Sequence, residues 1–402
     1  MQLRVNNMNR IIIENKESCC GCTACSSICP KNAIVMKSDK EGFSYPHIIE
    51  EKCINCGLCA KVCQTDKTHK YEKPIEILAA NNKNIDVRMK SSSGGFFPCL
   101  ADLVEQQHGV IYGASFTENF QVVHERAEKR AEWERFRTSK YVQSDLQNTF
   151  VNIQEDLANN RKVLFVGTPC QVEGLKLFLQ GKNTDKLITC DLVCHGVPSP
   201  RIWADYLKYV QKNSGRKIGK VNFRDKGHLG WHNSTITFGE QDTDDIILEG
   251  TQDKNFYFKM FFTHLILRPS CYKCKFANMH RVGDVTIGDF WGIEKSNPEM
   301  DDNKGTSLLL LNTKKGRDLF ETLKNDFEYI RVEEKDCLQP NLCRPSFRPK
   351  SREMFWRAYH LRGLEWAGKR AYLLPATKIE KVLIFADRVF GKVNSILLRI
   401  IR

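Results

Sequence analysis

The chain has no apolar run of the roughly 18 residues that a membrane-spanning helix needs. Even the apolar stretch VLIFADRVF is interrupted by Asp387 and Arg388, and the first residues, MQLRVNNMNR, lack the apolar core of a secretory signal. Disulfide-rich secreted scaffolds are short and follow such a signal. We therefore expect a cytoplasmic protein that crosses no membrane and keeps its 17 cysteines reduced.

No recognisable nucleic-acid-binding motif accompanies the formal net charge of +13. Lysine and arginine are spread along the chain among aspartate and glutamate. The charge is compatible with an anionic membrane surface, an acidic protein partner or a phosphate-bearing cofactor. We expect no nucleic-acid partner.

Cysteine is abundant, and its spacing near the N-terminus is specific. One run follows the pattern C-x2-C-x2-C-x3-C-P, and a second repeats it with Gln64 in the place of proline. In two-cluster bacterial ferredoxins, three cysteines of each run bind one cluster and the fourth binds the other. Cys20 is left over. The spacing assigns Cys19, Cys22, Cys25 and Cys63 to one [4Fe-4S] cluster, and Cys53, Cys56, Cys59 and Cys29 to the other.

A pair of zinc knuckles is the alternative, but the eight-thiol repeat with its proline favours clusters. Between the two runs, residues 33–49 predict two short strands around a turn at Glu41-Gly42. We therefore interpret residues 1–70 as a dicluster 4Fe-4S ferredoxin domain. Clusters of this kind move electrons singly, so the domain needs a redox partner.

Residues 71–350 alternate between strand and helix patterns, which predicts a mixed α/β domain. Several of the expected strands are continuously apolar, as in a sheet that is buried on both faces. The expected strands are 75–81, 110–116, 162–168, 186–196, 282–290 and 306–313. The expected helices are 94–107, 146–159, 171–180, 201–212 and 314–325.

Two stretches of this domain have residues suited to an anion. KSSSGGFFPCL puts small residues and free backbone N–H groups before a helix, where the helix dipole favours negative charge. The alternative is a serine N-cap on a flexible loop. RFRTSKYVQS adds Arg135, Arg137, Lys140 and Tyr141, which could neutralise a pyrophosphate and pack on a ring.

A second group of cysteines lies at the ends of predicted elements: Cys170, Cys194, Cys271 and Cys274. Cys170 stands at a helix start, where the dipole favours a thiolate, and the four thiols could converge on one metal. Cys190 is about 13 Å along the strand from Cys194, so we interpret it as a buried apolar residue. Two alternatives stay open: a zinc site on Cys271 and Cys274 with His195 or His280, or a nucleophilic Cys170 assisted by His195.

Several motifs in one order resemble the beta-subunit family of coenzyme F420 hydrogenase/dehydrogenase, here preceded by a fused ferredoxin domain. The matching stretches are SSSGGFF, TSKYVQS, VGTPCQVEGL, DLVCHGVPSP, CYKCKFA, VGDVTIGDFWG and KGTSLLLLNT. The resemblance implies an FAD near Ser91, Ser92, Ser93, Gly94, Gly95, Phe96, Lys140 and Tyr141. It also implies a third [4Fe-4S] cluster on Cys170, Cys194, Cys271 and Cys274.

The tail, residues 351–402, is rich in aromatic and basic residues. From Lys378 onward it predicts a basic amphipathic helix. Such a helix could lie peripherally on the inner face of the membrane or dock on a partner; the alternative is a terminal helix packed on its own domain.

These observations predict an FAD- and iron-sulfur-dependent oxidoreductase that exchanges electrons between a ferredoxin-type carrier and an organic two-electron substrate. The alternative is a non-catalytic subunit that relays electrons to a separate enzyme, for example in polysaccharide biosynthesis. The sequence identifies neither the substrate nor a catalytic residue.

Overall fold

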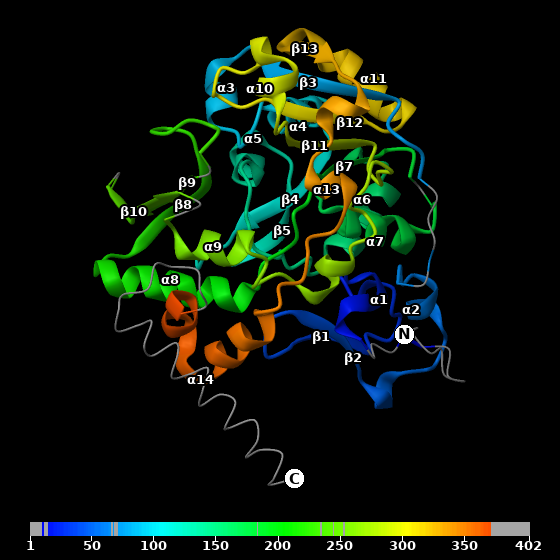
Figure 1. The fold of residues 1–402 in the computed structure, drawn as a ribbon. Helices are drawn as coiled ribbons and strands as arrows, with labels where there is room; N and C mark the ends of the chain where they lie inside the picture. The colour runs from blue at the N-terminus through cyan, green and yellow to red at the C-terminus, as the bar shows by residue number, and fades with distance from the viewer. Residues whose placement is uncertain are drawn as a thin grey trace.

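An eight-stranded mixed sheet forms the centre of the molecule (Figure 1). The computed structural model describes residues 10–11, 15–65, 67, 71–182, 184–233, 235–243, 245–251 and 254–370. In spatial order the strands are β13 (Phe327–Arg331), β3 (Glu76–Asn82), β12 (Ser307–Leu311), β11 (Val285–Asp289), β7 (Leu187–Leu192), β6 (Val163–Gly167), β4 (Val110–Phe116) and β5 (Val122–Ala127).

Four neighbouring strands of this sheet, β11, β7, β6 and β4, run parallel, and the outer strands are antiparallel. The predicted mixed α/β class is confirmed, and all six expected strands are present. The sequence patterns missed β5 and β13. Strand β7 ends at Leu192 rather than at the predicted residue 196, so Cys194 lies beyond the strand.

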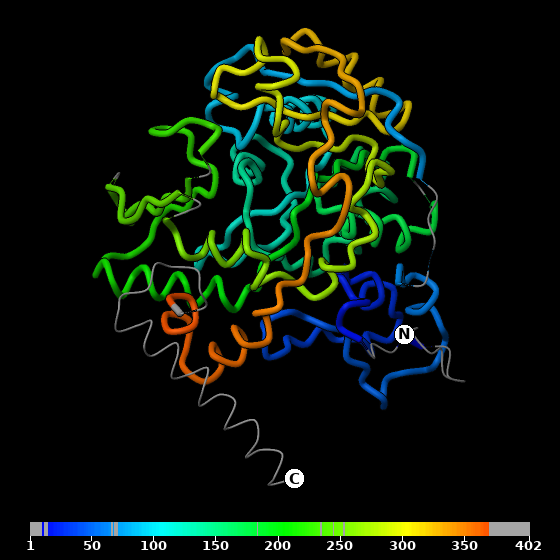
Figure 2. Tube along the Cα trace, in the orientation of Figure 1, coloured from blue at the N-terminus to red at the C-terminus, as the bar shows by residue number. Residues whose placement is uncertain are grey.

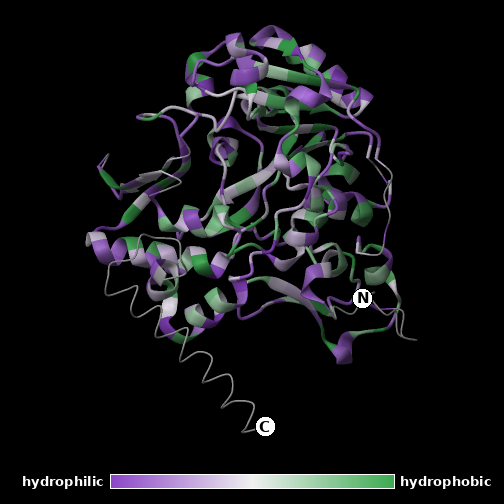
Figure 3. Ribbon diagram, in the orientation of Figure 1, coloured by the Kyte–Doolittle hydropathy of each residue, from purple (hydrophilic) through white to green (hydrophobic). Residues whose placement is uncertain are grey.

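Alternate residues of the central strands face two helical layers, as the period of a β-strand requires. Leu164 packs with helices α4 (Phe96–Gln106) and α11 (Lys314–Leu323). Val163 and Phe165 pack with α6 (Thr149–Ala158) and α7 (Pro169–Leu179). Figure 3 shows the apolar residues concentrated on these strands. The short helices are α3 (Ile85–Met89), α5 (Arg130–Trp133), α10 (Ile293–Ser296), α12 (Glu334–Cys337) and α13 (Pro340–Cys343).

The N-terminal part packs against the α7 side of this sheet (Figure 1). It contains α1 (Ala24–Ser27), α2 (Leu58–Lys61) and an antiparallel hairpin of β1 (Ile34–Ser38) and β2 (Ser44–Ile48). The predicted turn is confirmed, and Gly42 has the positive φ of 87° that such a tight turn favours. Ala24 and Val62 belong to the same hydrophobic cluster as the buried face of α7.

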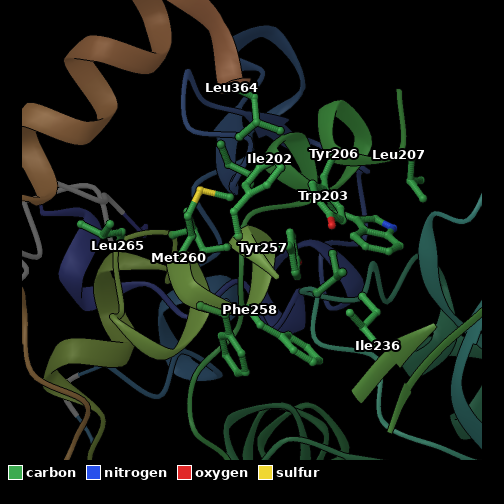
Figure 4. Packing of buried hydrophobic residues seen from close by; sticks show 14 of the residues in the cluster. Ile202, Trp203, Tyr206, Leu207, Ile236, Tyr257, Phe258, Met260, Leu265 and Leu364 are labelled. Atoms are coloured by element: carbon green, nitrogen blue, oxygen red, sulfur yellow. The ribbon is translucent and has the colours of Figure 1, made fainter. Parts of the chain in front are cut away.

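An aromatic core joins a second sheet to the helices below it (Figure 4). The sheet has the order β10-β9-β8. Trp203, Tyr206 and Tyr257 lie at the centre of this core. The strands are β8 (Ile218–Asp225), β9 (Thr235–Glu240) and β10 (Ile246–Thr251), and the helices are α8 (Pro200–Ser214), α9 (Phe256–Phe262) and α14 (Arg352–Arg370).

The described part of the predicted tail is helix α14, which packs on α8 and α9 through Phe355, Trp356 and Tyr359. This packing attaches residues 352–370 to the α/β part. The predicted basic helix from Lys378 onward lies outside the described residues. Within the described part, no helix is long and apolar enough to cross a membrane. In Figure 2 the chain passes the sheet before α14, and Arg348 ion-pairs with Glu17 of the N-terminal part.

Candidate functional site

Four cysteines of the ferredoxin-like part line one small pocket, and we call them the outer set: Cys29, Cys53, Cys56 and Cys59. The backbone N–H of Ala33 donates to the Cys29 sulfur at 3.3 Å, and the N–H of Ile11 donates to the Cys59 sulfur at 3.4 Å. Backbone donors of this kind tune cluster potentials. Cys56 is exposed, and neighbouring Ile54 is 58% exposed, so the outer set lies at the surface.

The other four, Cys19, Cys22, Cys25 and Cys63, form the inner set. Burial raises the pKa of Cys25 well above its ordinary value, and the nearby thiols of Cys22, Cys19 and Cys63 raise it further. Cys22 lies directly against helix α7: a Cβ on Gly174 would stand 2.7 Å from the Cys22 Cβ. The inner set therefore faces the α/β part rather than solvent.

The parallel sheet explains how two cysteines of the α/β part come together. Gly167 of β6 and Asp191 of β7 are paired, and Cys170 and Cys194 each lie three residues beyond that pair. Carboxyl ends of parallel strands share one sheet edge, which is the usual place for ligands in such folds. We call the following four residues the third set: Cys170, Cys194, Cys271 and Cys274.

The third set converges at this edge. Burial raises the pKa of Cys271 well above its ordinary value, and the Cys194, Cys274 and Cys170 thiols raise it further. The N–H groups of Gly196 and Val197 donate to the sulfurs of Cys194 and Cys271, both at 3.4 Å. Cys190 is fully buried in β7, within the sheet core.

Among the described residues, no three His, Cys, Asp or Glu side chains converge closely enough to hold one metal ion. A tetrahedral zinc bound by thiolates at about 2.3 Å would draw the sulfurs to within about 4 Å of one another. The corners of a four-iron cubane hold their thiolates farther apart.

Cys20, which the spacing left unassigned, lies between the inner and third sets. Its thiol hydrogen-bonds with the thiols of both Cys22 and Cys170. This contact lowers the pKa of Cys22 to about 7, and it also lowers the pKa of Cys170. The inner and third sets are therefore adjacent, and one side chain bridges them.

Gln64, the departure from the proline of the motif, makes a second link. Its side chain is buried, and its amide Nε2 donates to the Cys170 carbonyl oxygen at 2.9 Å. It also hydrogen-bonds with the Cys22 thiol, where it lowers the pKa. Proline could make neither contact, so glutamine at this position joins the ferredoxin-like part to the start of α7.

His195 is held in an aromatic environment. Asn341 donates to its Nδ1 at 3.2 Å, and its ring lies 4.9 Å from Phe261 and 4.7 Å from His264 between ring centres. Burial lowers the pKa of His195 to about 4. These contacts describe a neutral, packed imidazole. His280, the other candidate, is exposed and hydrogen-bonds with the Tyr71 carbonyl oxygen.

The structure brings together the two stretches suited to an anion, although they are distant in sequence. The Ser139 N–H donates to the Ser92 hydroxyl at 2.8 Å, and Arg137 donates to the Ser91 hydroxyl at 3.3 Å. Gly94 and Gly95 are buried where the loop enters α4, and Ser93 is half-buried beside them.

Lys140 is half-buried at the edge of this loop pair. Its ammonium donates to the carbonyl oxygens of Arg135, Arg137 and Thr138, and burial lowers its pKa to about 7. Two aromatic candidates point elsewhere. Phe96 packs on Phe320 and Phe327 in the sheet core, and Tyr141 stacks on Phe261 at 4.9 Å.

Lys226, which sequence reasoning missed, stands on the other side of the loop. Its ammonium donates to the carbonyl oxygens of Arg88, Ser93 and Lys304 at 2.9, 2.8 and 2.6 Å. Burial lowers its pKa to about 7. No motif marks this lysine, because it reaches the loop from the end of β8, more than a hundred residues away.

Two parts of the chain match models of known protein families. Residues 160–336 match the family model for the C terminus of the coenzyme F420 hydrogenase/dehydrogenase beta subunit, and residues 18–67 match the 4Fe-4S dicluster domain. Residues 160–336 therefore form a domain of the coenzyme F420 hydrogenase/dehydrogenase beta-subunit family, and residues 18–67 form a 4Fe-4S dicluster domain. The chain is thus an iron-sulfur electron-transfer protein of the coenzyme F420 hydrogenase/dehydrogenase type.

Two individual proteins are similar to parts of this chain. An uncharacterized ferredoxin of Methanocaldococcus jannaschii is 38% identical over 55 residues, which are 14% of this chain and 70% of that protein. One protein chain of the F420-reducing [NiFe] hydrogenase complex from Methanosarcina barkeri aligns with 15% identity and a TM-score of 0.47. That alignment covers 74% of this chain and 91% of the other.

Proposed function

We propose that this chain is an iron-sulfur flavoprotein oxidoreductase. An organic two-electron substrate would exchange electrons with an FAD in the α/β part, and three [4Fe-4S] clusters would exchange them with a ferredoxin-type carrier. The third set would hold the cluster nearest the flavin. The inner and outer sets would hold the clusters that lead to the surface.

The adjacency of the three thiol sets carries this proposal. Cys20 contacts a member of the inner set and a member of the third set, and Cys63 brings the second cysteine run to the inner set. The outer set ends the series at exposed Cys56. A continuous series from the sheet edge to the surface is what single-electron transfer to an external carrier requires.

The residues around the serine loop fit an anionic cofactor. Ser92 and Ser93 are half-buried hydroxyls on a loop whose glycines precede the positive end of α4. Gly94 has no room for a side chain, because a Cβ there would meet the Ala80 carbonyl oxygen at 2.2 Å. The ammonium groups of half-buried Lys140 and buried Lys226 hold the two sides of this loop.

Ser92, Ser93, Gly95 and Lys140 would therefore hold the cofactor. Bound FAD would accept two electrons from an organic donor and release them singly. Lys226 fixes the Ser93 carbonyl, and Arg137 fixes the Ser91 hydroxyl, so both position the loop. Phe96 and Tyr141 would support the site from the core instead of contacting the ring.

Anaerobic purification followed by iron, sulfide, zinc and flavin analysis tests the proposal. We expect about twelve irons and one flavin per chain, because each cubane holds four irons. Cys170→Ser should lower the iron content by about four and spare the other eight. Cys190→Ala is the matched control, because Cys190 is a buried thiol of β7 that belongs to none of the three sets. This variant should retain all twelve irons.

About eight irons in the wild-type protein would contradict the third cluster, and zinc in place of the missing iron would favour a structural metal site. A second measurement separates the enzyme from an electron-relaying subunit. Reduction of the flavin by an organic substrate in the isolated chain is expected for the enzyme. Reduction that requires a second purified protein would favour the relay.

A further inference from the structure

Arg268 is a fully buried cation between the ferredoxin-like part and the α/β part. Its Nε donates to the Cys19 carbonyl oxygen at 2.8 Å, and its two terminal nitrogens donate to Gln143 Oε1 and the Ser44 carbonyl oxygen, both at 2.9 Å. The guanidinium also lies 3.7 Å from the Cys19 sulfur and stacks 4.4 Å from the ring centre of Tyr45. Residues from both parts of the chain therefore surround it.

No carboxylate neutralises this charge within the described part of the chain. All hydrogen-bond partners of the guanidinium are uncharged oxygens except the Cys19 thiol. Burial alone would lower the pKa of Arg268, but the groups of Cys19, Tyr45, Cys20 and Cys271 together raise it. A buried cation without an anionic partner is strongly unfavourable. The negative charge that compensates Arg268 is therefore expected to come from the thiolates beside it.

Two other buried arginines in this region differ in this respect. Arg281, near the third set, forms an ion pair with buried Asp191 at 3.0 Å. Arg352 crosses the same boundary as Arg268 and pairs with Glu41 of the β1–β2 turn. Carboxylates neutralise both of these charges. Of the three arginines, only Arg268 lies next to thiols without a carboxylate partner.

We propose that Arg268 is a positioning residue that raises the reduction potential of the cluster bound by the inner set. A fixed cation next to Cys19 stabilises the more negative, reduced form of the cluster over the oxidised form. In a buried site this electrostatic effect is little screened by water. Cluster charge and nearby hydrogen bonds are known determinants of such potentials.

The position of Arg268 extends the effect toward the α/β part. Cys271 of the third set lies three residues along the chain, and its N–H donates to the Arg268 carbonyl oxygen at 2.9 Å. Arg268 thus contacts the inner set through its guanidinium and the third set through its backbone, whereas the outer set lies at the surface. Arg268 would keep the inner cluster a ready acceptor for electrons that arrive from the third set.

The proposal rests on the proposed function only in requiring a cluster at Cys19. An EPR-monitored redox titration of the full-length, iron-loaded protein tests it. Arg268→Gln should move the midpoint potential of one or two clusters to more negative values by at least about 59 mV, which is a tenfold change in a one-electron equilibrium. Arg268→Lys should stay much closer to the wild type, because the charge is kept.

Arg352→Gln is the matched control, because it removes a buried arginine at the same boundary without touching a thiol. It should leave all midpoint potentials unchanged. Unchanged potentials in a fully iron-loaded Arg268→Gln protein would overturn the proposal. So would an equal shift in Arg352→Gln, since the effect would then come from loosened packing.

If the Arg268→Gln protein does not bind iron, a second variant tests whether the charge of Arg268 sets the potential. Gln143→Glu puts a carboxylate on the atom that already accepts from Arg268 and so neutralises the cation in place. The midpoint potential of the inner-set cluster should shift to more negative values in this variant as well. An unchanged midpoint potential in the iron-loaded variant would overturn the proposal. Failure of the proposed function gives a different result, namely a wild-type protein without inner-set iron.

Discussion

The inner and outer thiol sets arise from the same repeated spacing, yet their surroundings are opposite. The inner set is pressed against α7, bridged to Cys170 by Cys20 and faced by a buried arginine. The outer set lines a surface pocket next to exposed Ile54. Two sites of one ferredoxin-like motif are thus suited to different tasks. Under the proposed function, the inner site would exchange electrons within the molecule, and the outer site would exchange them with an external carrier.

The largest difference between the inner and outer sets is expected when one cysteine ligand is removed from each. Cys22→Ser should remove about four irons and loosen the contact between the two parts, because the inner set is itself part of that contact. Cys56→Ser should also remove about four irons but leave the contact intact. Iron analysis and limited proteolysis of the full chain measure both effects.

Rapid cleavage of Cys22→Ser with slow cleavage of Cys56→Ser is the expected pattern. Equal cleavage of the two variants would show that the inner set does not help to join the two parts. The Cys190→Ala protein serves again as the control for loss of a buried thiol outside both sets.

The inner and outer sets of the wild-type protein should lose their iron to a chelator at different rates. A chelator reaches the outer set directly through exposed Cys56, whereas the inner set opens only when the two parts separate. We expect about four irons to leave in a fast phase and the remainder in a phase at least about tenfold slower. A single phase for all iron would contradict the difference in protection.

Sequence reasoning predicted the composition of the sets but not their surroundings. The cysteine spacing identified eight ligand candidates, because a cluster needs thiols at fixed intervals along the chain. The strand patterns identified six strands of the sheet, because buried strands are continuously apolar. The spacing assigned no role to Cys20, and Gln64 was only a departure from the proline of the motif. Both residues make contacts between the ferredoxin-like part and the α/β part, and a local sequence pattern does not predict such long-range contacts.

The locality of sequence patterns also explains why Arg268 and Lys226 were missed. Each is a single basic residue whose partners lie far away in the chain, and neither belongs to a motif. The strand prediction for residues 186–196 was too long at its end for a related reason. The apolar pattern continues to Val193, but β7 ends at Leu192, and Cys194 lies beyond the strand.

A substitution on α7 should affect the inner set and not the outer set, without removing a ligand from either. Gly174→Ala would place a Cβ 2.9 Å from the Cys22 sulfur. Overpacking of this kind costs about 1–3 kcal/mol. We expect a lower thermal unfolding midpoint and a faster loss of the slow-phase iron, with the fast phase unchanged. Gly239→Ala, in the separate sheet, is the control and should change neither iron phase; an altered fast phase in Gly174→Ala would contradict the prediction.

The smallest effect is expected from Cys20→Ala. The ligand spacing predicts that both ferredoxin clusters survive without this thiol, so the iron content should equal that of the wild type. Because Cys20 hydrogen-bonds with Cys22 and with Cys170, its loss should still weaken the link between the inner and third sets. Stopped-flow measurements of cluster reduction by a reduced flavin should therefore show slower transfer by a few-fold. The outer set lies at the surface, so exchange with an external carrier should keep its wild-type rate. A loss of about four irons would instead make Cys20 a ligand and would reassign the inner or the third set.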